Sequence, residues 1–241
     1  MAAKYEEEIF SVFEEDRNKR LLQYFEKYAN PAHTAIDCGC GRGNAFPYLS
    51  PRFKKVIAVD FSEKLLETAR LHAPANVELG RTDLTKKNPG LPKADFAFCC
   101  NVAMFPETKK NLAIIKNVQG ALKRGCNAVF VLPSLESVIS KSWFTAEWFR
   151  KEGVAFEEIP RSQWADYKFG TKSFLLGLID INGVTTKHYL RSEIIHLFDT
   201  CGLQVVKTDK LEYDWNTEFE SPPAWMQEPY PWDWLVECRK K

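Results

Sequence analysis

The sequence has no apolar run long enough to cross a bilayer, and its first residues lack the apolar core of a secretory signal. It also lacks an excess of either charge, because 33 basic side chains nearly balance 32 acidic ones and leave a net charge of +1. Proteins that clamp DNA or RNA through the phosphates usually carry a basic excess. We therefore expect a cytoplasmic protein that does not span a membrane and for which a nucleic-acid partner is disfavoured.

Cysteine is present, but not in the pattern of a disulfide framework or a metal site. The seven cysteines are an odd number, and Cys38, Cys99, Cys100 and Cys126 fall within or at the ends of predicted buried strands. This placement indicates a reduced, cytoplasmic setting. Cys38 and Cys40 form a C-x-C pair, but no second cluster has metal-ligand spacing. We interpret the pair as small apolar fillers beside a turn and expect no metal.

The most informative stretch is a glycine-rich turn in residues 35–44. A short apolar run is followed by three glycines at alternate positions, and a second apolar run, residues 56–59, ends in the acid Asp60. This order predicts a strand, a tight turn, a helix and a second strand, which together form a nucleotide-binding unit. Glycine lets the backbone approach a ligand closely, and an acid at the tip of the second strand suits the two hydroxyls of a ribose.

The spacing of the glycines indicates which nucleotide is bound. A dinucleotide fingerprint, G-x-G-x-x-G/A, needs a small residue at its sixth position, but this position is Asn44 counted from Gly39 and Phe46 counted from Gly41. Asp37 lies two residues before the first glycine, where a carboxylate would repel a pyrophosphate and attract a ligand with an ammonium group. S-adenosylmethionine is such a ligand.

These residues resemble the first motif of the class I S-adenosylmethionine-dependent methyltransferases, an acid followed by G-x-G-x-G. Segments 80–84, 94–102 and 121–131 are similar, in order and spacing, to the later motifs of that family, and the resemblance covers about residues 30 to 135. It implies an enzyme that uses S-adenosylmethionine and releases S-adenosylhomocysteine. The cofactor-binding residues implied are Asp37, Gly39, Cys40, Gly41, Gly43, Asp60, Phe61, Asp83, Leu84 and Asn101.

The resemblance implies a single α/β domain over residues 1–241. Its fold is a Rossmann-like, seven-stranded, mostly parallel sheet with helices on both faces and an antiparallel last strand, to which a hairpin and lid are added. The expected parts are a cofactor-covering helix in residues 1–30, a cofactor-binding half in 31–135, a lid and hairpin insertion on the substrate side in 136–190, and a closing helix and strands in 191–241.

Local patterns place several elements of this fold. Apolar residues at helical spacing predict a helix over residues 6–28, and Ser62 is expected to cap a helix that ends near residue 71. A further helix is predicted over residues 112–122. Residues 134–169 mix aromatic and charged side chains without strand periodicity, and we expect them to form a mobile or substrate-facing segment.

The later part of the chain carries a strong hairpin signal. Asn182 and Gly183 separate two apolar, β-branched runs and predict a hairpin with strands over residues 174–180 and 184–190. Ser192 and Glu193 then predict a helix that extends to residue 200 and is ended by Gly202. The last two strands are expected over residues 203–213 and 232–239.

Tryptophan is absent from the first 140 residues, and all seven tryptophans lie beyond this point. This asymmetry predicts an aromatic pocket on the substrate side, suited to a flat ring or a cationic amine. The substrate-binding candidates are Trp143, Trp148 and Trp164. Trp232 and Trp234 alternate in a predicted strand, which favours a packing role for them.

Methyl transfer from a sulfonium needs little acid–base chemistry, because the methyl group is already activated. Positioning and the exclusion of water are the main requirements, although an alcohol or ammonium acceptor must still lose one proton. His188 is the first candidate for the base, since it lies in the second predicted hairpin strand and titrates near neutrality. Tyr189 and Tyr167 are weaker candidates, and a structural role for His188 is the alternative.

The predicted fourth strand is followed by Cys-Asn-Val-Ala at residues 100–103. This turn has neither the N-P-P-Y sequence with which similar enzymes methylate planar amino groups nor a Pro-Cys pair for attack on cytosine, and no tandem carboxylates follow it. The best interpretation is a methyltransferase for a small-molecule acceptor, acting on oxygen, nitrogen or sulfur. A protein methyltransferase with an acidic groove from residues 212–228, and a non-catalytic member that binds the cofactor or a partner, remain open. An oligomer is also possible, through the hairpin edge.

Overall fold

The computed structural model describes residues 11–160, 163, 170–181 and 183–241. Seven strands form one mixed sheet in the order β3-β2-β1-β4-β5-β9-β8, in which β9 is antiparallel to both of its neighbours. The pairings from β3 to β5 are all parallel. This confirms the predicted fold class. The strands are β1 (Asn30–Cys38), β2 (Phe53–Asp60), β3 (Val77–Arg81), β4 (Ala94–Cys100), β5 (Leu122–Pro133), β8 (Leu203–Glu212) and β9 (Trp232–Lys240).

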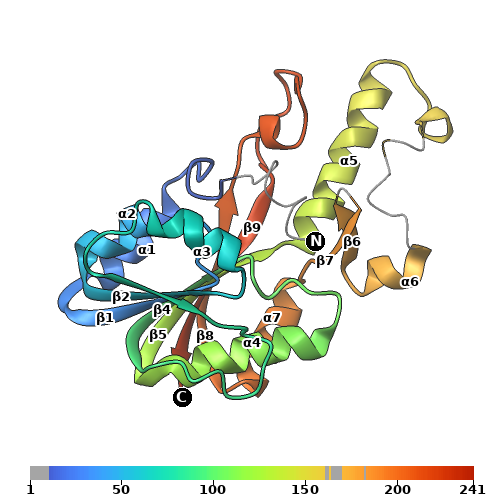
Figure 1. The fold of residues 1–241 in the computed structure, drawn as a ribbon. Helices are drawn as coiled ribbons and strands as arrows, with labels where there is room; N and C mark the ends of the chain where they lie inside the picture. The colour runs from blue at the N-terminus through green and yellow to red at the C-terminus, as the bar shows by residue number, and fades with distance from the viewer. Residues whose placement is uncertain (1–10, 161–162, 164–169, 182) are drawn as a thin grey trace.

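Helices cover both faces of this sheet (Figure 1). One face carries α1 (Arg20–Tyr28), α2 (Phe46–Leu49) and α3 (Glu63–Arg70), and the other carries α4 (Thr108–Ala121) and α7 (Arg191–Thr200). Ser62 caps α3 as predicted, because its side chain accepts a hydrogen bond from the backbone N–H of Leu65. Short 3-10 turns are η2 (Ser50–Arg52), η3 (Phe156–Glu158) and η5 (Trp215–Thr217).

The central strands are apolar on both sides, which is why they need two layers of helices. In β4, Phe98 packs in the core on the α1 side with Phe25, and the neighbouring Cys99 packs on the α4 side with Ile114. The alternation of side chains along a strand therefore assigns each residue to one face. The face of the sheet that α1 covers is called the α1 face, and the face that α4 covers is called the α4 face.

The carboxyl ends of β1, β2, β4 and β5 lie at one edge of the sheet, called the carboxyl edge here. The antiparallel β9 begins at the same edge, because Asp233 pairs with Pro133 at the end of β5. Two segments rise from this edge in Figure 1, α5 (Leu135–Lys151) and the connection between β8 and β9. In α/β folds the ligand binds at this edge.

The N-terminal helix is shorter than predicted. Residues 6–10 lie outside the described residues, and the helix begins at Arg20 rather than within residues 11–19. Asp16 explains the start, since its carboxylate accepts the backbone N–H of Leu21 at 2.7 Å and so caps the helix. The backbone N–H of Arg17 donates to the carbonyl of Glu212 at 3.1 Å, which fixes the preceding segment against the end of β8.

Sequence patterns predicted no regular element in residues 134–169, but the first half of this segment is helical. Residues Leu135–Lys151 form the regular helix α5, which Ser134 caps by accepting a hydrogen bond from the N–H of Ser137 at 3.0 Å. Aromatic side chains on several sides of this helix hide its periodicity, because they pack against a distant segment. None of the helices in the described residues has the length and apolar character that a membrane span requires.

The predicted hairpin is present, with shorter strands. Strands β6 (Leu178–Ile181) and β7 (Val184–Lys187) pair antiparallel in a separate two-stranded sheet, and Asn182 at the turn lies outside the described residues. The prediction that the first strand begins at residue 174 is wrong, because α6 (Gly170–Leu175) precedes it and Gly177 turns the chain with a φ of 70°. The second strand ends at Lys187, before His188.

Candidate functional site

The glycine turn follows β1 at the carboxyl edge. Gly39, Gly41 and Gly43 have positive φ angles of 83°, 53° and 91°, which other residues rarely adopt. A Cβ on Gly39 would lie 2.2 Å from Cγ2 of Val102, and one on Gly43 would lie 2.4 Å from the ring of Phe46. A Cβ on Gly41 would meet no described atom within 4 Å. Gly39 and Gly43 are therefore required by packing, whereas Gly41 lies beside open space.

Asp60, at the end of β2, is held against this turn. It is 7% exposed, and its two carboxylate oxygens accept the backbone N–H of Gly41 at 3.0 Å and that of Ser62 at 2.9 Å. A carboxylate has about four acceptor positions. The two backbone bonds thus fix the orientation of Asp60 and leave acceptor positions for a ligand.

Asp37 is the most unusual group of the site. It is only 2% exposed, and its Oδ2 has no hydrogen-bond partner among the described residues. Burial, and to a smaller extent the charge of Asp60, raises the pKa of Asp37 from 3.8 to about 7. An unpaired buried carboxylate oxygen destabilises the protein unless a donor reaches it. The position is therefore suited to a cationic ligand.

The remaining predicted cofactor residues lie around the same edge. Cys40 is buried within the turn, and burial raises the pKa of its thiol. Phe61, directly after Asp60, is 61% exposed. The N–H of Thr82 donates to the carbonyl of Asp60 at 2.8 Å, which brings the next two residues close to it. These are Asp83, whose pKa is lowered by a hydrogen bond from the hydroxyl of Thr85, and the buried Leu84.

Asn101 follows β4 at the same edge, in a left-handed conformation with a φ of 53°. Its backbone N–H donates to the carbonyl of Val131 at 3.0 Å. The side-chain oxygen of Asn101 is buried and has no hydrogen-bond partner in the described part of the chain. Asn101 is thus a second group at this edge whose acceptor a ligand could satisfy.

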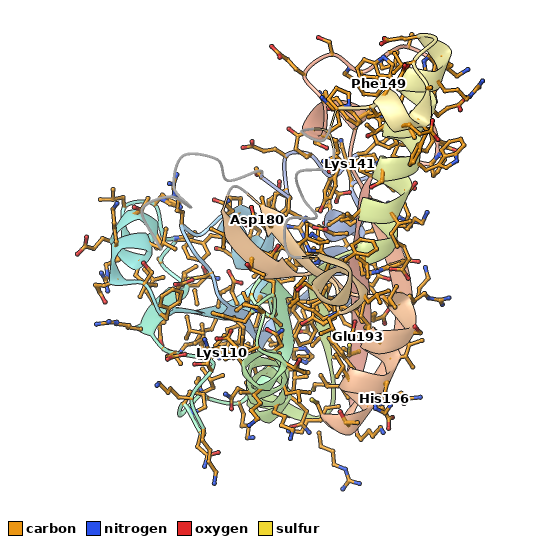
Figure 2. All side chains as sticks on the ribbon, turned by 90° about the vertical axis from the view of Figure 1, so that its right-hand side faces the viewer. Lys110, Lys141, Phe149, Asp180, Glu193 and His196 are labelled. Carbon is orange, nitrogen blue, oxygen red and sulfur yellow. The ribbon has the colours of Figure 1, made fainter. Side chains whose placement is uncertain are left out.

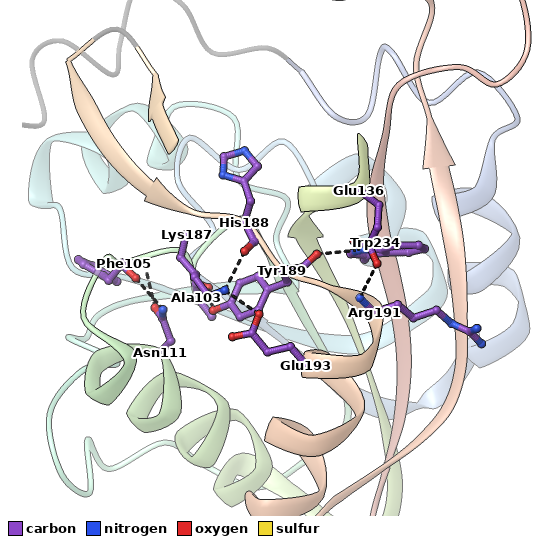
Figure 3. Close-up of polar contacts among 10 residues, drawn as sticks. All are labelled: Ala103, Phe105, Asn111, Glu136, Lys187, His188, Tyr189, Arg191, Glu193 and Trp234. Carbon is purple, nitrogen blue, oxygen red and sulfur yellow. Dashed lines mark hydrogen bonds and ion pairs between the residues drawn. The ribbon is translucent and has the colours of Figure 1, made fainter. Parts of the chain in front are cut away.

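The loop after β4 is anchored by the end of the hairpin. The hydroxyl of the fully buried Tyr189 donates to the carbonyl of Ala103 at 2.5 Å. The backbone N–H of Lys187 donates to the carbonyl of Met104 at 2.9 Å. The ammonium group of Lys187 pairs with Glu193 at 2.6 Å (Figure 3). These contacts hold the loop after β4 against Tyr189, and the catalytic role of Tyr189 stays a prediction.

His188, the first predicted base, is buried beside this anchor. Its pKa is lowered to about 4, chiefly by burial and further by the charges of Lys187 and Lys141. Its ring points away from the Lys187 contacts (Figure 3), and Nδ1 has no partner among the described residues. A group with so low a pKa is a weak base at neutral pH. The catalytic role of His188 stays a prediction, and Tyr167 lies outside the described residues.

The aromatic residues of α5 pack against the connection between β8 and β9. Phe144 forms a buried cluster with Trp215, Met226 and Tyr230. Trp148 packs beside this cluster and lines a cavity of about 390 Å³, with Phe149 and Phe219. Phe149 lies toward the free end of α5, farther from the sheet than Lys141 (Figure 2).

Two of the predicted substrate-binding tryptophans, Trp143 and Trp148, lie on α5. Trp143 is 61% exposed and contacts the ring of Phe144 edge-on, outside the cavity that Trp148 lines. Trp164 lies outside the described residues. The substrate role of these three residues stays a prediction.

Sequence analysis missed a polar cluster at the start of β9. Oδ2 of the partly exposed Asp233 accepts the hydroxyl of Tyr213 at 2.8 Å, and the carboxylate also accepts hydrogen bonds from the side chain of Asn101 and the backbone of Ser134. Burial, and to a smaller extent the charge of Glu218, raises the pKa of Asp233 to about 6 in spite of these bonds. The cluster lies at the carboxyl edge, beside the loop after β4.

The sequence of residues 35–125, which includes the glycine turn, Asp60 and Asn101, matches the family model of the methyltransferase domain. This part of the chain is thus similar to a methyltransferase domain. The cofactor of this class of enzyme is S-adenosylmethionine, which is released as S-adenosylhomocysteine. A search of curated proteins gave no match.

Solved structures show the same fold around this methyltransferase domain. A S-adenosylmethionine-dependent methyltransferase from Methanosarcina mazei is 16% identical, with a TM-score of 0.62 and coverage of 90% of this chain and 96% of that one. One from Mesorhizobium loti is 17% identical, with a TM-score of 0.62 and coverage of 92% and 97%. Magnesium protoporphyrin IX methyltransferase from Synechocystis, with bound S-adenosylhomocysteine, is 14% identical, with a TM-score of 0.55 and coverage of 92% and 81%.

The residues of the methyltransferase domain fit this cofactor. The unpaired oxygen of Asp37 suits its ammonium group, and the fixed carboxylate of Asp60 suits its ribose hydroxyls. The open space beside Gly41 admits a ligand close to the backbone, and the exposed ring of Phe61 offers an apolar surface to the adenine.

Proposed function

We propose that the protein transfers the methyl group of S-adenosylmethionine to a small-molecule acceptor. The observation that carries this proposal is the buried Asp37, whose unpaired oxygen lies next to the glycine turn and suits a cationic partner. When bound, the cofactor supplies a methyl group already activated by the sulfonium.

In this proposal the protein mainly binds and orients the reactants. Asp37 accepts hydrogen bonds from the ammonium group of the cofactor, and Asp60 accepts those of the ribose hydroxyls. Residues 11–19 and α5 flank the carboxyl edge and exclude water from it. Alignment of acceptor and methyl group then supplies most of the rate enhancement.

A small acceptor is favoured over a protein because three acidic side chains of the predicted groove are engaged within the chain. Asp214 pairs with Arg17, Glu212 accepts a hydrogen bond from Asn18 at 2.9 Å, and Glu218 pairs with Lys141 at 2.9 Å. These side chains therefore do not offer the open acidic groove that a lysine or arginine of a protein substrate would need. The similar enzyme from Synechocystis is a methyltransferase of magnesium protoporphyrin IX, a small molecule.

The proposal is tested with S-adenosylmethionine that carries an isotopic label on its methyl group. The purified protein is incubated either with a small-molecule metabolite extract or with the protein fraction of the same extract. Label in small molecules supports the proposal, and label in proteins alone contradicts it. Cofactor binding without any transfer would instead indicate a non-catalytic member.

A further inference from the structure

Asp233 projects from the same face of the sheet as the cofactor residue Asp37. On β9, Trp232 and Trp234 lie in the core on the α4 face. Leu235 of β9 and Val131 of β5 lie in the core on the α1 face. Because side chains alternate along a strand, Asp233 belongs to the α1 face. Asp37 belongs to that face as well, since its neighbours Ile36 and Cys38 pack on the α4 side.

Two strands, β4 and β5, separate β1, which carries Asp37, from β9, which carries Asp233. Cys100, at the end of β4, packs on the α1 face, and the charges of both Asp233 and Asp37 act on its thiol. Asn101, the next residue, hydrogen-bonds to Asp233 while its own oxygen stays buried and without a partner among the described residues. The end of β4 therefore connects the cofactor position to Asp233.

The carboxylate of Asp233 is held in a fixed orientation by hydrogen bonds. Its hydrogen bonds come from three separate elements: Tyr213 after β8, Asn101 after β4, and the backbone of Ser134 at the start of α5. The residue is nevertheless partly exposed at the carboxyl edge. Such an arrangement resembles a preorganised acceptor site rather than a packed core residue.

We propose that Asp233 binds the methyl acceptor and takes up its proton, and that this acceptor is a primary or secondary amine. The inference rests on the proposed function and names the acceptor class for the same site. Asn101 and Tyr213 are positioning residues, which hold the carboxylate toward the space beside Asp37.

The charge and basicity of the site favour an amine. The carboxylate of Asp233 attracts a cation, whereas the charge of the nearby Glu218 is balanced by Lys141 on α5. The pKa of Asp233, about 6, leaves it ionised at neutral pH. A carboxylate of this basicity is far too weak to deprotonate an alcohol, but it can take a proton from an ammonium group whose own pKa is lowered by burial.

The proposed step balances in atoms and charge. The ammonium group of the acceptor gives one proton to the Asp233 carboxylate, which becomes a carboxylic acid. The freed nitrogen lone pair attacks the methyl carbon of S-adenosylmethionine, so that a nitrogen–carbon bond forms as the sulfur–carbon bond breaks. The bonding pair stays on sulfur, and the positive charge of the sulfonium passes to the methylated amine.

The test compares Asp233→Asn, Asp233→Glu and a matched control with the wild-type protein. The control is Asp209→Asn, because Asp209 of β8 also accepts a tyrosine hydroxyl, that of Tyr24 at 2.8 Å, but outside the site. Binding of S-adenosylhomocysteine is first measured by calorimetry. Transfer of labelled methyl groups to a small-molecule extract is then measured after cation exchange, which separates amines from neutral products.

We expect wild type and Asp209→Asn to methylate compounds of the amine fraction with equal kcat/KM. Asp233→Asn should bind S-adenosylhomocysteine normally and lose at least about 100-fold in kcat/KM, and Asp233→Glu should recover part of this loss. The wild-type kcat/KM should rise with pH through about 6, the pKa of Asp233, and this acid limb should vanish in Asp233→Asn. The titratable groups facing Asp233 are Cys100, Tyr213 and Glu218.

Two results would overturn the inference while leaving the proposed function standing. One is transfer to oxygen or sulfur compounds alone, and the other is undiminished transfer by Asp233→Asn. Binding of S-adenosylhomocysteine with no methylated amine would also reject it. Failure of the wild-type protein to bind S-adenosylhomocysteine at all would instead refute the proposed function on which the inference depends.

Discussion

Replacement of Asp37 by asparagine should stabilise the protein without cofactor and weaken its binding of S-adenosylmethionine. Asp37 is 2% exposed, and burial raises its pKa from 3.8 to about 7. A raised folded-state pKa means that stability is lost as the pH rises from the unfolded value to the folded one. The shift of about three pKa units corresponds to about 4 kcal/mol above pH 7.

This linkage can be measured by urea unfolding of the cofactor-free proteins at two pH values. From the two pKa values, ionisation of Asp37 destabilises the wild type by about 2 kcal/mol at pH 5 and by about 4 kcal/mol at pH 8. Asparagine carries no such charge. The gain in unfolding free energy of Asp37→Asn over wild type should thus be larger by about 2 kcal/mol at pH 8 than at pH 5.

Cofactor binding should change in the opposite direction. A hydrogen bond to a charged group contributes about 1.5–3 kcal/mol, so loss of the Asp37 carboxylate should raise the Kd of S-adenosylmethionine roughly 10- to 100-fold at pH 8. In the wild type, affinity should increase as the pH rises through about 7, because a cation favours the ionised carboxyl. An equal stability difference at both pH values, or unchanged affinity in the variant, would refute the reasoning.

Further predictions concern the glycine turn and the loop after β4. Gly39→Ala places a Cβ 2.2 Å from Val102 and should lower the unfolding free energy by about 1–3 kcal/mol in urea, whereas Gly41→Ala meets no described atom within 4 Å. Gly41→Ala should therefore lose less stability yet raise the Kd of S-adenosylhomocysteine at least about tenfold by calorimetry, and equal affinity would contradict this account. Tyr189→Phe removes the bond to the carbonyl of Ala103 and should destabilise the protein by about 1–3 kcal/mol in urea, and unchanged stability would show that this bond does not anchor the loop.

The cofactor half of the molecule was predictable because its signals are local. The three glycines and the two acids of the turn lie within 24 residues of one another, from Asp37 to Asp60, and the glycines adopt the positive φ angles that such a turn needs. The seven-stranded, mostly parallel sheet with an antiparallel last strand was implied by the resemblance to the methyltransferase family, and the structure confirms it.

The substrate side was less predictable because its partners are distant in the sequence. The apolar residues of α5 did not show a clear helical periodicity, because Phe144 packs against Trp215 and Tyr230, about 70 to 90 residues later. The sequence predicted a pKa near neutrality for His188, because the burial that lowers this pKa depends on the tertiary structure. The only sequence signal for a role of Asp233 was its position between Trp232 and Trp234 in a predicted strand. Its partners Tyr213 and Asn101 are distant in the sequence and reach Asp233 only in the folded sheet.

The most direct test of the account is the binding of S-adenosylmethionine and S-adenosylhomocysteine to the wild type, Asp60→Ala and Asp95→Asn by calorimetry. Asp95 is the matched control, since it accepts the N–H of Thr34 at 3.0 Å and pairs with Lys123 at 2.7 Å, at the opposite edge of the sheet. The account predicts micromolar binding to wild type and Asp95→Asn, and none to Asp60→Ala. Absence of binding to the wild type, or undiminished binding to Asp60→Ala, would contradict the assignment of the glycine turn to this cofactor.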